Sequence, residues 1–190
     1  MITNMAELLA AHERGERFEY IFFWGHQPRP DGEIGKSCLS QWWPAEFEMD
    51  GVRYGTAEHY MMAAKARLFN DPVRLEQILA AEHPEQVKKL GRQVEGFDRE
   101  VWERHRVEIV ATANYAKFGQ NEALRAYLLG SGERILVEAS PYDKIWGIGL
   151  GEGAEGIEDP TRWGGLNLLG FVLMGVRGRL AEGRGETGSD

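Results

Sequence analysis

The segment from Tyr54 to Phe69, YGTAEHYMMAAKARLF, carries two charged side chains that could do chemistry, Glu58 and Lys65. In a helix these positions share one side and lie about 10 Å apart along the axis. That separation is too long for an ordinary ion pair within a helix. They therefore either serve a site, or Glu58 complements the positive helix N-terminus while Lys65 extends its amine to water.

A second candidate segment is EASPYDKIWGIG, residues 138–149. It reads as a strand that delivers a loop with Asp143, Lys144 and Trp146, followed by glycines that let backbone approach a ligand closely. The alternative is an ordinary Asx turn followed by a packed tryptophan.

The use of lysine points to a third segment, NYAKFGQN, residues 114–121, with Asn114 and Lys117. The chain has 16 arginines and six lysines, and Lys65, Lys117 and Lys144 fall in the three candidate segments. Arginine is the usual choice where a fixed cation suffices, so these lysines suggest phosphate contact or amine chemistry. Lys117 at a helix C-terminus is also expected from the helix dipole alone.

The sequence contains only incomplete matches to metal-binding and dinucleotide-binding motifs. GEGAEG, residues 151–156, matches a dinucleotide fingerprint by letters, but it opens no predicted helix and places carboxylates where pyrophosphate would bind. Glu58-His59 would need a histidine at Gly55 to form an inverted zinc motif, and the other histidines lack metal-ligand spacing. The sequence therefore predicts no metal and no cofactor.

The single cysteine, Cys38, excludes an intrachain disulfide and fits a reducing compartment. Together with His26 or His59 it could form a thiol dyad, and the alternative is inert packing.

Composition sets further limits. A chain of 190 residues without a run of about 18 apolar residues, and with a charged N-terminal segment, is expected to be one cytoplasmic domain that does not span a membrane. A net charge of -8 disfavours binding to a long nucleic acid and leaves room for a local site for one phosphate.

The elements that would position these residues are mostly helices. Asp50-Gly51 predicts a tight hairpin turn within residues 46–54. Thr56, Asp71, Asp98 and Asn121 are predicted to cap helices. Further predictions are a buried strand over 18–25, a helix from Pro84, a strand over 134–140, a last helix over 166–180 and a disordered tail, 181–190.

Several unusual sequence segments, in this order along the chain, resemble the YbiA-like, or NADAR, family of N-glycosidases. They are FFWG, LSQWWPAEF, DGVRYGTAEHYMMAAKA, KFGQNEALRAYLLGSGERILVEASPYDKIWGIG and WGGLNLLGFVLMGVR. The resemblance runs from about residue 20 to 177. It implies a mainly α (α+β) fold, a single multihelical domain over residues 1–180 with a short N-terminal strand and a β-hairpin.

The resemblance also implies a reaction. Family members hydrolyse the ribosyl C–N bond either of phosphorylated ribosylamino-pyrimidine intermediates of riboflavin synthesis or of ADP-ribose attached to guanine. The small phosphorylated ribosyl compound fits the net charge better, and a flipped, modified guanine stays an alternative. A different class of function is a non-catalytic module that binds nucleotides or ADP-ribose.

Residue roles follow by matching segments. Glu58 would stabilise the cationic sugar carbon or orient the attacking water, and Asp143 would protonate or hold the leaving base. Trp146 would stack on the base, with Trp24 lining the opposite wall.

The cations have less definite roles. Lys65 would hold a phosphate or the ribose oxygens, or attack the sugar carbon as an amine with a lowered pKa. Lys117 and Arg53 are candidates for phosphate contact, and Asn167 for polar positioning. The acidic stretch EGAEGIEDP, residues 152–160, departs from the family pattern and could narrow substrate access.

Overall fold

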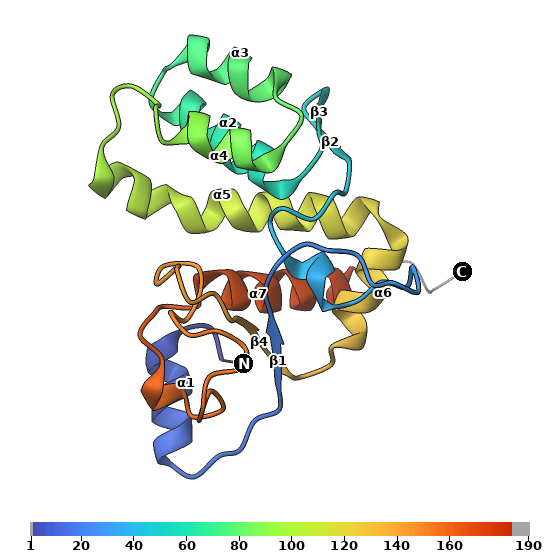
Figure 1. Cartoon of the computed structure of the whole chain (residues 1–190), viewed down its shortest axis with the longest axis vertical. Coiled ribbons are helices and arrows are strands. Elements are labelled where there is room, and N and C mark those ends of the chain that lie inside the picture. Colours follow the sequence, from blue (N-terminus) through green and yellow to red (C-terminus); the bar gives the residue numbers. More distant parts are fainter. Residues whose placement is uncertain (1, 184–190) are drawn as a thin grey trace. The chain divides into compact units, whose positions relative to one another are not determined.

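The computed structural model describes residues 2–183, and Figure 1 shows the arrangement of the elements. In this part of the chain helices predominate over four short strands, which confirms the predicted mostly helical α+β fold. The α-helices are α1 (Met5–Glu13), α2 (Ala57–Leu68), α3 (Pro72–Ala80), α4 (Pro84–Gly91), α5 (Arg99–Gln120), α6 (Glu122–Gly130) and α7 (Leu168–Glu182). The strands are β1 (Tyr20–Phe23), β2 (Phe47–Met49), β3 (Val52–Tyr54) and β4 (Ile135–Glu138), and two short 3-10 helices are η1 (Lys36–Leu39) and η2 (Pro160–Arg162).

The chain folds into two compact units. The first combines the residues up to Ser40 with those from Ala123 onward, and the second runs from Gln41 to Glu122. The sequence analysis did not anticipate this division, because contacts between the two ends of a chain leave no local pattern.

The second unit opens with the predicted hairpin. Strands β2 and β3 pair antiparallel, with Phe47 opposite Tyr54. Asp50 and Gly51 both have positive φ, 50° and 74°, as a two-residue turn of the primed type requires. The predicted hairpin is confirmed.

Helix α2 lies at the centre of the second unit and packs against α3, α4 and α5 (Figure 1). Seven of its 12 residues are buried. The approach of α4 requires Gly91, since a Cβ there would lie 2.0 Å from the sulfur of Met62. The predicted caps of α2, α3 and α5 are confirmed: the side chains of Thr56, Asp71 and Asp98 each accept a hydrogen bond from the first turn of the helix that follows.

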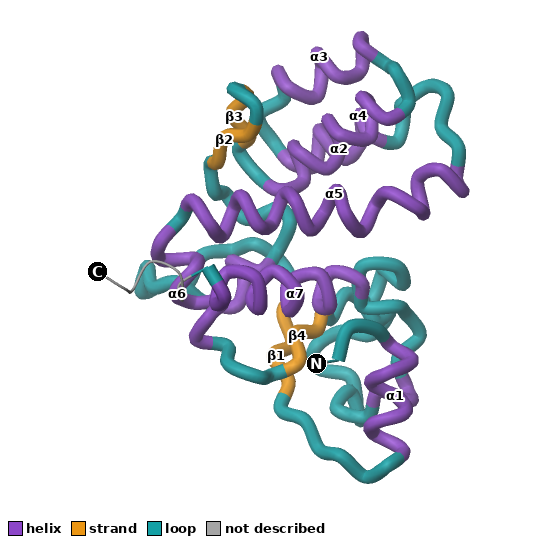
Figure 2. Tube along the Cα trace, turned by 180° about the vertical axis from the view of Figure 1, so that it is seen from behind, coloured by secondary structure: helices purple, strands orange, loops and turns teal. Residues whose placement is uncertain are grey.

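The first unit is built on a parallel pair of strands. Strand β1 pairs with β4, with Tyr20 opposite Ile135, and Figure 2 shows the pair next to α7. Helix α7 packs on β4 at Gly170, where a Cβ would lie 2.0 Å from the Leu136 carbonyl oxygen. Both strands were predicted, but in β1 only Phe23 is fully buried, so the prediction of a buried strand over residues 18–25 is only partly right.

After β4, residues 141–149 form a loop that lies directly on the backbone of residues 164–169. The amides of Gly164, Leu166 and Leu169 donate to carbonyls of this loop at distances of 2.9, 2.9 and 3.2 Å. Gly165 permits the contact, because a Cβ there would lie 2.3 Å from the Gly147 carbonyl oxygen. The glycines of the DKIWGIG and WGG segments thus allow the two backbone stretches to pack directly against each other.

Other elements differ from the sequence-based expectations. Helix α1 was not predicted. Helix α7 continues through Ala181 and Glu182, because Leu180 is buried and anchors its last turn, so the predicted disordered tail does not begin at residue 181. Residues 184–190 of that tail lie outside the described part of the chain.

Asn121 acts at a different helix end from the one predicted. Its side-chain amide donates to the carbonyls of Lys117 and Glu46, at 2.8 and 3.0 Å, and so closes the C-terminus of α5. A single residue, Asn121, separates α5 from α6, and its side-chain nitrogen bonds to a carbonyl in the last turn of the longer helix.

The buried ring of His59 ties α2 to the end of α3. Its Nε2 donates to the Ala81 carbonyl at 3.0 Å, and its Nδ1 lies 2.7 Å from the Thr56 hydroxyl, which also accepts from the His59 amide. A neutral ring with the proton on Nε2 satisfies these contacts. Burial accordingly lowers the pKa of His59, and the bond to Ala81 offsets part of this effect.

We expect this histidine to make folding pH-dependent. Because its pKa is lower in the folded protein than in the unfolded chain, the unfolded chain binds the proton more tightly. The stabilisation from neutral His59 is therefore complete above about pH 6.5 and is lost as the pH falls through the folded-state pKa. Urea unfolding across this range should show that His59→Gln has a flatter pH dependence than the wild type; equal slopes would contradict the assignment.

Candidate functional site

Glu58 lies in the first turn of α2 and is buried, with 6% of its surface exposed. Its amide donates to the Gln41 carbonyl at 3.0 Å. The position next to the helix N-terminus agrees with the simple electrostatic alternative, but that alternative does not require burial. Taking a carboxylate out of water is costly, so its burial marks Glu58 as a candidate for a chemical role.

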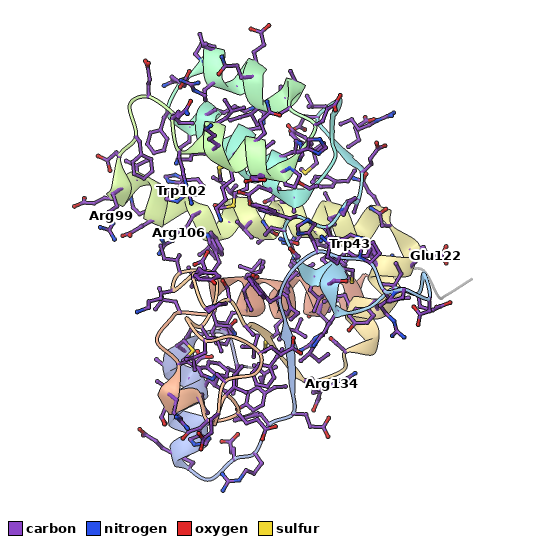
Figure 3. The ribbon with its side chains drawn as sticks, viewed as in Figure 1. Trp43, Arg99, Trp102, Arg106, Glu122 and Arg134 are labelled. Carbon is purple, nitrogen blue, oxygen red and sulfur yellow. The ribbon has the colours of Figure 1, made fainter. Side chains whose placement is uncertain are left out.

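Lys65 does not extend its amine freely into water. It is half-buried, and its Nζ donates to the Gly91 carbonyl at 2.7 Å. The same nitrogen lies 4.4 Å from the centre of the Phe97 ring and 5.6 Å from that of Trp102. Figure 3 labels Trp102 on the first turns of α5. The amine is thus held in one place by a carbonyl and two aromatic faces.

The environment also changes the acidity of this amine. Burial lowers the pKa of Lys65, Arg92 lowers it further, and the negative charge of Glu58 raises it. Glu58 and Lys65 therefore influence each other electrostatically across two turns of α2. The net lowering increases the fraction of neutral amine, the form that can act as a nucleophile.

A buried polar contact joins α5 to the start of α2. The Asn114 side chain donates to the Gln41 side-chain oxygen at 2.7 Å, while the Gln41 carbonyl accepts from Glu58. Asn114 also donates to the Val110 carbonyl at 2.8 Å within α5. The sequence analysis missed Gln41, because a glutamine in an irregular loop carries no periodic signal.

Lys117 and Arg53, the other basic candidates of the second unit, differ sharply in exposure. Lys117 is fully buried one turn beyond Asn114, with its amine 4.9 Å from the Phe118 ring centre. A helix-dipole role alone would not require that burial. The Arg53 side chain is exposed on the hairpin, 3.9 Å from the Glu46 carboxylate. Exposed pairs of this kind contribute little to stability.

In the first unit, Asp143 shapes the loop that follows β4. Its Oδ1 accepts hydrogen bonds from the amides of Ile145 and Trp146, both at 2.8 Å. This is the Asx turn that the sequence left open as an alternative. No hydrogen bond joins Oδ2 to another residue in the described part of the chain.

The tryptophans of the first unit differ in exposure. Trp146 is half-buried, whereas Trp24, directly after β1, has 51% of its surface exposed. The Trp24 ring contacts Tyr142, with ring centres 6.2 Å apart. The sequence analysis missed Tyr142, although it directly precedes Asp143.

Asn167 serves the fold. It is fully buried, its side-chain Nδ2 donates to the Leu136 carbonyl at 2.9 Å, and its Oδ1 accepts from the Glu138 backbone amide at 3.0 Å. Both atoms thus extend the hydrogen bonding of β4. A positive φ of 50° allows the backbone to enter α7 at this point.

The predicted site residues form two groups. Glu58, Lys65, Lys117 and Arg53 belong to the second unit, and Trp24, Asp143, Trp146 and Asn167 belong to the first. Within residues 2–183, no group of three or more His, Cys, Asp or Glu side chains is placed to hold a metal ion. No helix in this range is long and apolar enough to cross a membrane.

Comparison with known proteins gives a consistent result. The NADAR domain family model matches residues 22–181. An N-glycosidase of Acanthamoeba polyphaga mimivirus is 41% identical over 168 residues, which are 85% of this chain and 96% of that protein. N-glycosidase YbiA of Escherichia coli is 34% identical over 73% of this chain and 77% of its own length. A riboflavin biosynthesis protein of Vibrio vulnificus is 34% identical over 80% of this chain and 37% of its own length.

The solved structure of Escherichia coli YbiA is also similar, with a TM-score of 0.70 at 28% identity over 92% of both chains. Fold and sequence define a YbiA-like protein. The chain belongs to the NADAR domain family, whose relatives named above include N-glycosidases, hydrolases of N-glycosyl bonds. The resemblance found in the sequence is confirmed.

The environment of Lys65 leads to a prediction about its reactivity. Acetylation across a pH series, followed by peptide mass spectrometry, should show that the pKa of Lys65 lies below the ordinary range of a lysine amine. Arg92→Gln should raise the pKa of Lys65 and Glu58→Gln should lower it, since each removes one of the charges that act on it. A pKa of Lys65 in the ordinary lysine range would contradict the description of this amine.

Proposed function

We propose that this chain is an N-glycosidase that hydrolyses the ribosyl C–N bond of phosphorylated ribosylamino-pyrimidines, with Glu58 and Lys65 as its main catalytic residues. The observation that carries the proposal is the buried Glu58 on the same helix as the restrained, half-buried Lys65, in a family with named N-glycosidases. The riboflavin biosynthesis protein of Vibrio vulnificus supports the choice of substrate.

Glu58 supplies negative charge to the reaction. Cleavage of a ribosyl C–N bond builds positive charge on the anomeric carbon and the ring oxygen. A carboxylate fixed beside that carbon stabilises the transition state more than the ground state, and in a dry environment the effect is large. The same carboxylate can orient the attacking water.

Lys65 acts as a nucleophile in the route that its environment favours. The neutral amine attacks the anomeric carbon, the bond to the base breaks, and the base leaves with a proton. The lysine then holds the opened sugar as a Schiff base, and water releases the sugar and restores the amine. In the other route Lys65 stays a cation that holds phosphate or ribose oxygens while water attacks directly.

Asp143 and Trp146 are proposed to receive the leaving base. Oδ1 of Asp143 is already used by two backbone amides, which leaves Oδ2 to accept a hydrogen bond from an amino group of the base. Trp146 offers a ring for stacking. Lys117 and Arg53 are secondary candidates for phosphate contact.

Two rivals are separable by experiment. Hydrolysis of guanine-linked ADP-ribose would use the same charged groups on a larger substrate. A non-catalytic module would bind nucleotide or ADP-ribose without product, and the burial of both Glu58 and Lys65 argues against it, because simple binding does not require a buried carboxylate. Incubation with each substrate class and mass analysis of the released sugar distinguishes all three.

Substitution of the acidic residues should abolish turnover in a folded protein. Glu58→Gln removes the charge at nearly constant shape, and we expect kcat to fall by at least about 100-fold. Asp143→Asn keeps the turn and changes the group offered to the base, with an expected loss of about 100-fold.

Two control variants make the same chemical changes at positions outside the proposed site. Glu100→Gln makes the same change at the same position of the first turn of α5, where the side chain is exposed. Asp159→Asn changes the capping aspartate of η2, whose Oδ1 also accepts a backbone amide. Both should keep wild-type turnover, and full activity of Glu58→Gln would refute the role of Glu58.

The covalent route makes its own prediction. Borohydride added during turnover should attach a reduced sugar phosphate to the Lys65 peptide and leave the exposed Lys89 unmodified. Lys65→Arg keeps the positive charge but cannot attack, so it should lose both trapping and turnover. Turnover by Lys65→Arg would instead assign the residue to phosphate or ribose contact.

A further inference from the structure

The exposed ring of Tyr142 is the least expected feature of the first unit. With 86% of its surface exposed, it is the most exposed of the large hydrophobic residues in the described part of the chain. Its neighbour Trp24 is 51% exposed, and the two ring centres lie 6.2 Å apart at an interplanar angle of 53°. Adjacent exposed aromatic rings are a common mark of a ligand-binding surface.

The position of this pair is fixed by the backbone. Trp24 directly follows β1, and the Ala139 amide continues the pairing of the strands by donating to the Phe23 carbonyl at 2.9 Å. The buried Ser140 hydroxyl accepts from the amides of Tyr142 and Asp143, at 3.4 and 3.2 Å. Both rings therefore project from restrained backbone at the carboxyl ends of two parallel strands, where ligands commonly bind in parallel sheets.

We infer that Trp24 and Tyr142 form an aromatic clamp that binds the flat heteroaromatic base of the substrate, with Tyr142 as the movable wall. This inference rests on the proposed function for the identity of the ligand. It replaces Trp146 by Tyr142 as the partner of Trp24, because Tyr142 is the ring that Trp24 contacts.

The geometry suits a flat ligand that enters by rotation of one ring. A base stacked between two rings needs their planes parallel and about 7 Å apart, twice the usual contact distance between carbon atoms. The present distance of 6.2 Å between the ring centres is close to that spacing, whereas the interplanar angle of 53° requires one ring to turn. The solvent around Tyr142 leaves its side chain room for this rotation. Asp143 directly follows Tyr142, so its Oδ2 can accept from an amino group at the edge of a stacked base.

Binding of ligands that are not hydrolysed tests the clamp apart from catalysis. GMP and CMP supply a base with a ribose phosphate, and ribose 5-phosphate lacks the base. We expect Tyr142→Leu and Trp24→Leu to weaken GMP and CMP binding by about 5- to 100-fold in calorimetry, the range found for stacking on a base. Ribose 5-phosphate should bind all variants like the wild type.

Tyr142→Phe is the matched control, since it keeps the ring and removes only the hydroxyl. It should bind GMP within about twofold of the wild type. Tyr142 is almost fully exposed, so its variants should unfold at the wild-type temperature, and they decide the question if Trp24→Leu is unstable.

Three outcomes would overturn the clamp: wild-type affinity for GMP and CMP in Tyr142→Leu, an equal loss of ribose 5-phosphate binding, or no binding of either nucleotide by the wild type. The assay also separates the two proposals. Ring-dependent binding of a base, with no sugar release from any substrate, would support the clamp and refute the glycosidase.

Discussion

The burial of charged groups on α2 is the constraint on which the second unit depends. Three helices pack around α2, and they leave Glu58 almost without solvent and hold the Lys65 amine against the Gly91 carbonyl. Each charged group is expensive to remove from water, so its partners must be placed accurately. Gly91 contributes in two ways. Its lack of a side chain leaves room for Met62, and its carbonyl oxygen accepts a hydrogen bond from the Lys65 amine.

In the first unit, hydrogen bonds order the backbone of a loop while one of its aromatic side chains stays exposed. Glycines allow residues 141–149 to lie on the backbone of 164–169, and Asp143 and Ser140 fix the turn from within. The result is a loop whose backbone is ordered by hydrogen bonds and whose Tyr142 ring faces water. Rigid backbone with exposed aromatic rings lowers the entropy cost of binding a flat ligand.

Local sequence signals were reliable where a short-range interaction decides the structure. The Asp50-Gly51 turn and the caps Thr56, Asp71 and Asp98 were predicted because each depends on residues within four positions. Prediction was less successful where long-range packing decides. Leu180 extends α7 beyond the predicted end, because its burial depends on distant residues. Helix α1 was missed for another reason, since its cap Asn4 is a local signal that the prediction overlooked.

The sequence by itself determined the family, the mostly helical fold and the identity of Glu58, Lys65 and Asp143 as candidates, because these follow from residue order and short spacing. Only the tertiary structure decided which polar groups are buried and what surrounds them. It placed Lys65 between Phe97 and Trp102, committed Asn167 to β4, and paired Trp24 with Tyr142. These contacts join residues 29 to 118 positions apart, and such separations leave no periodic trace in the chain.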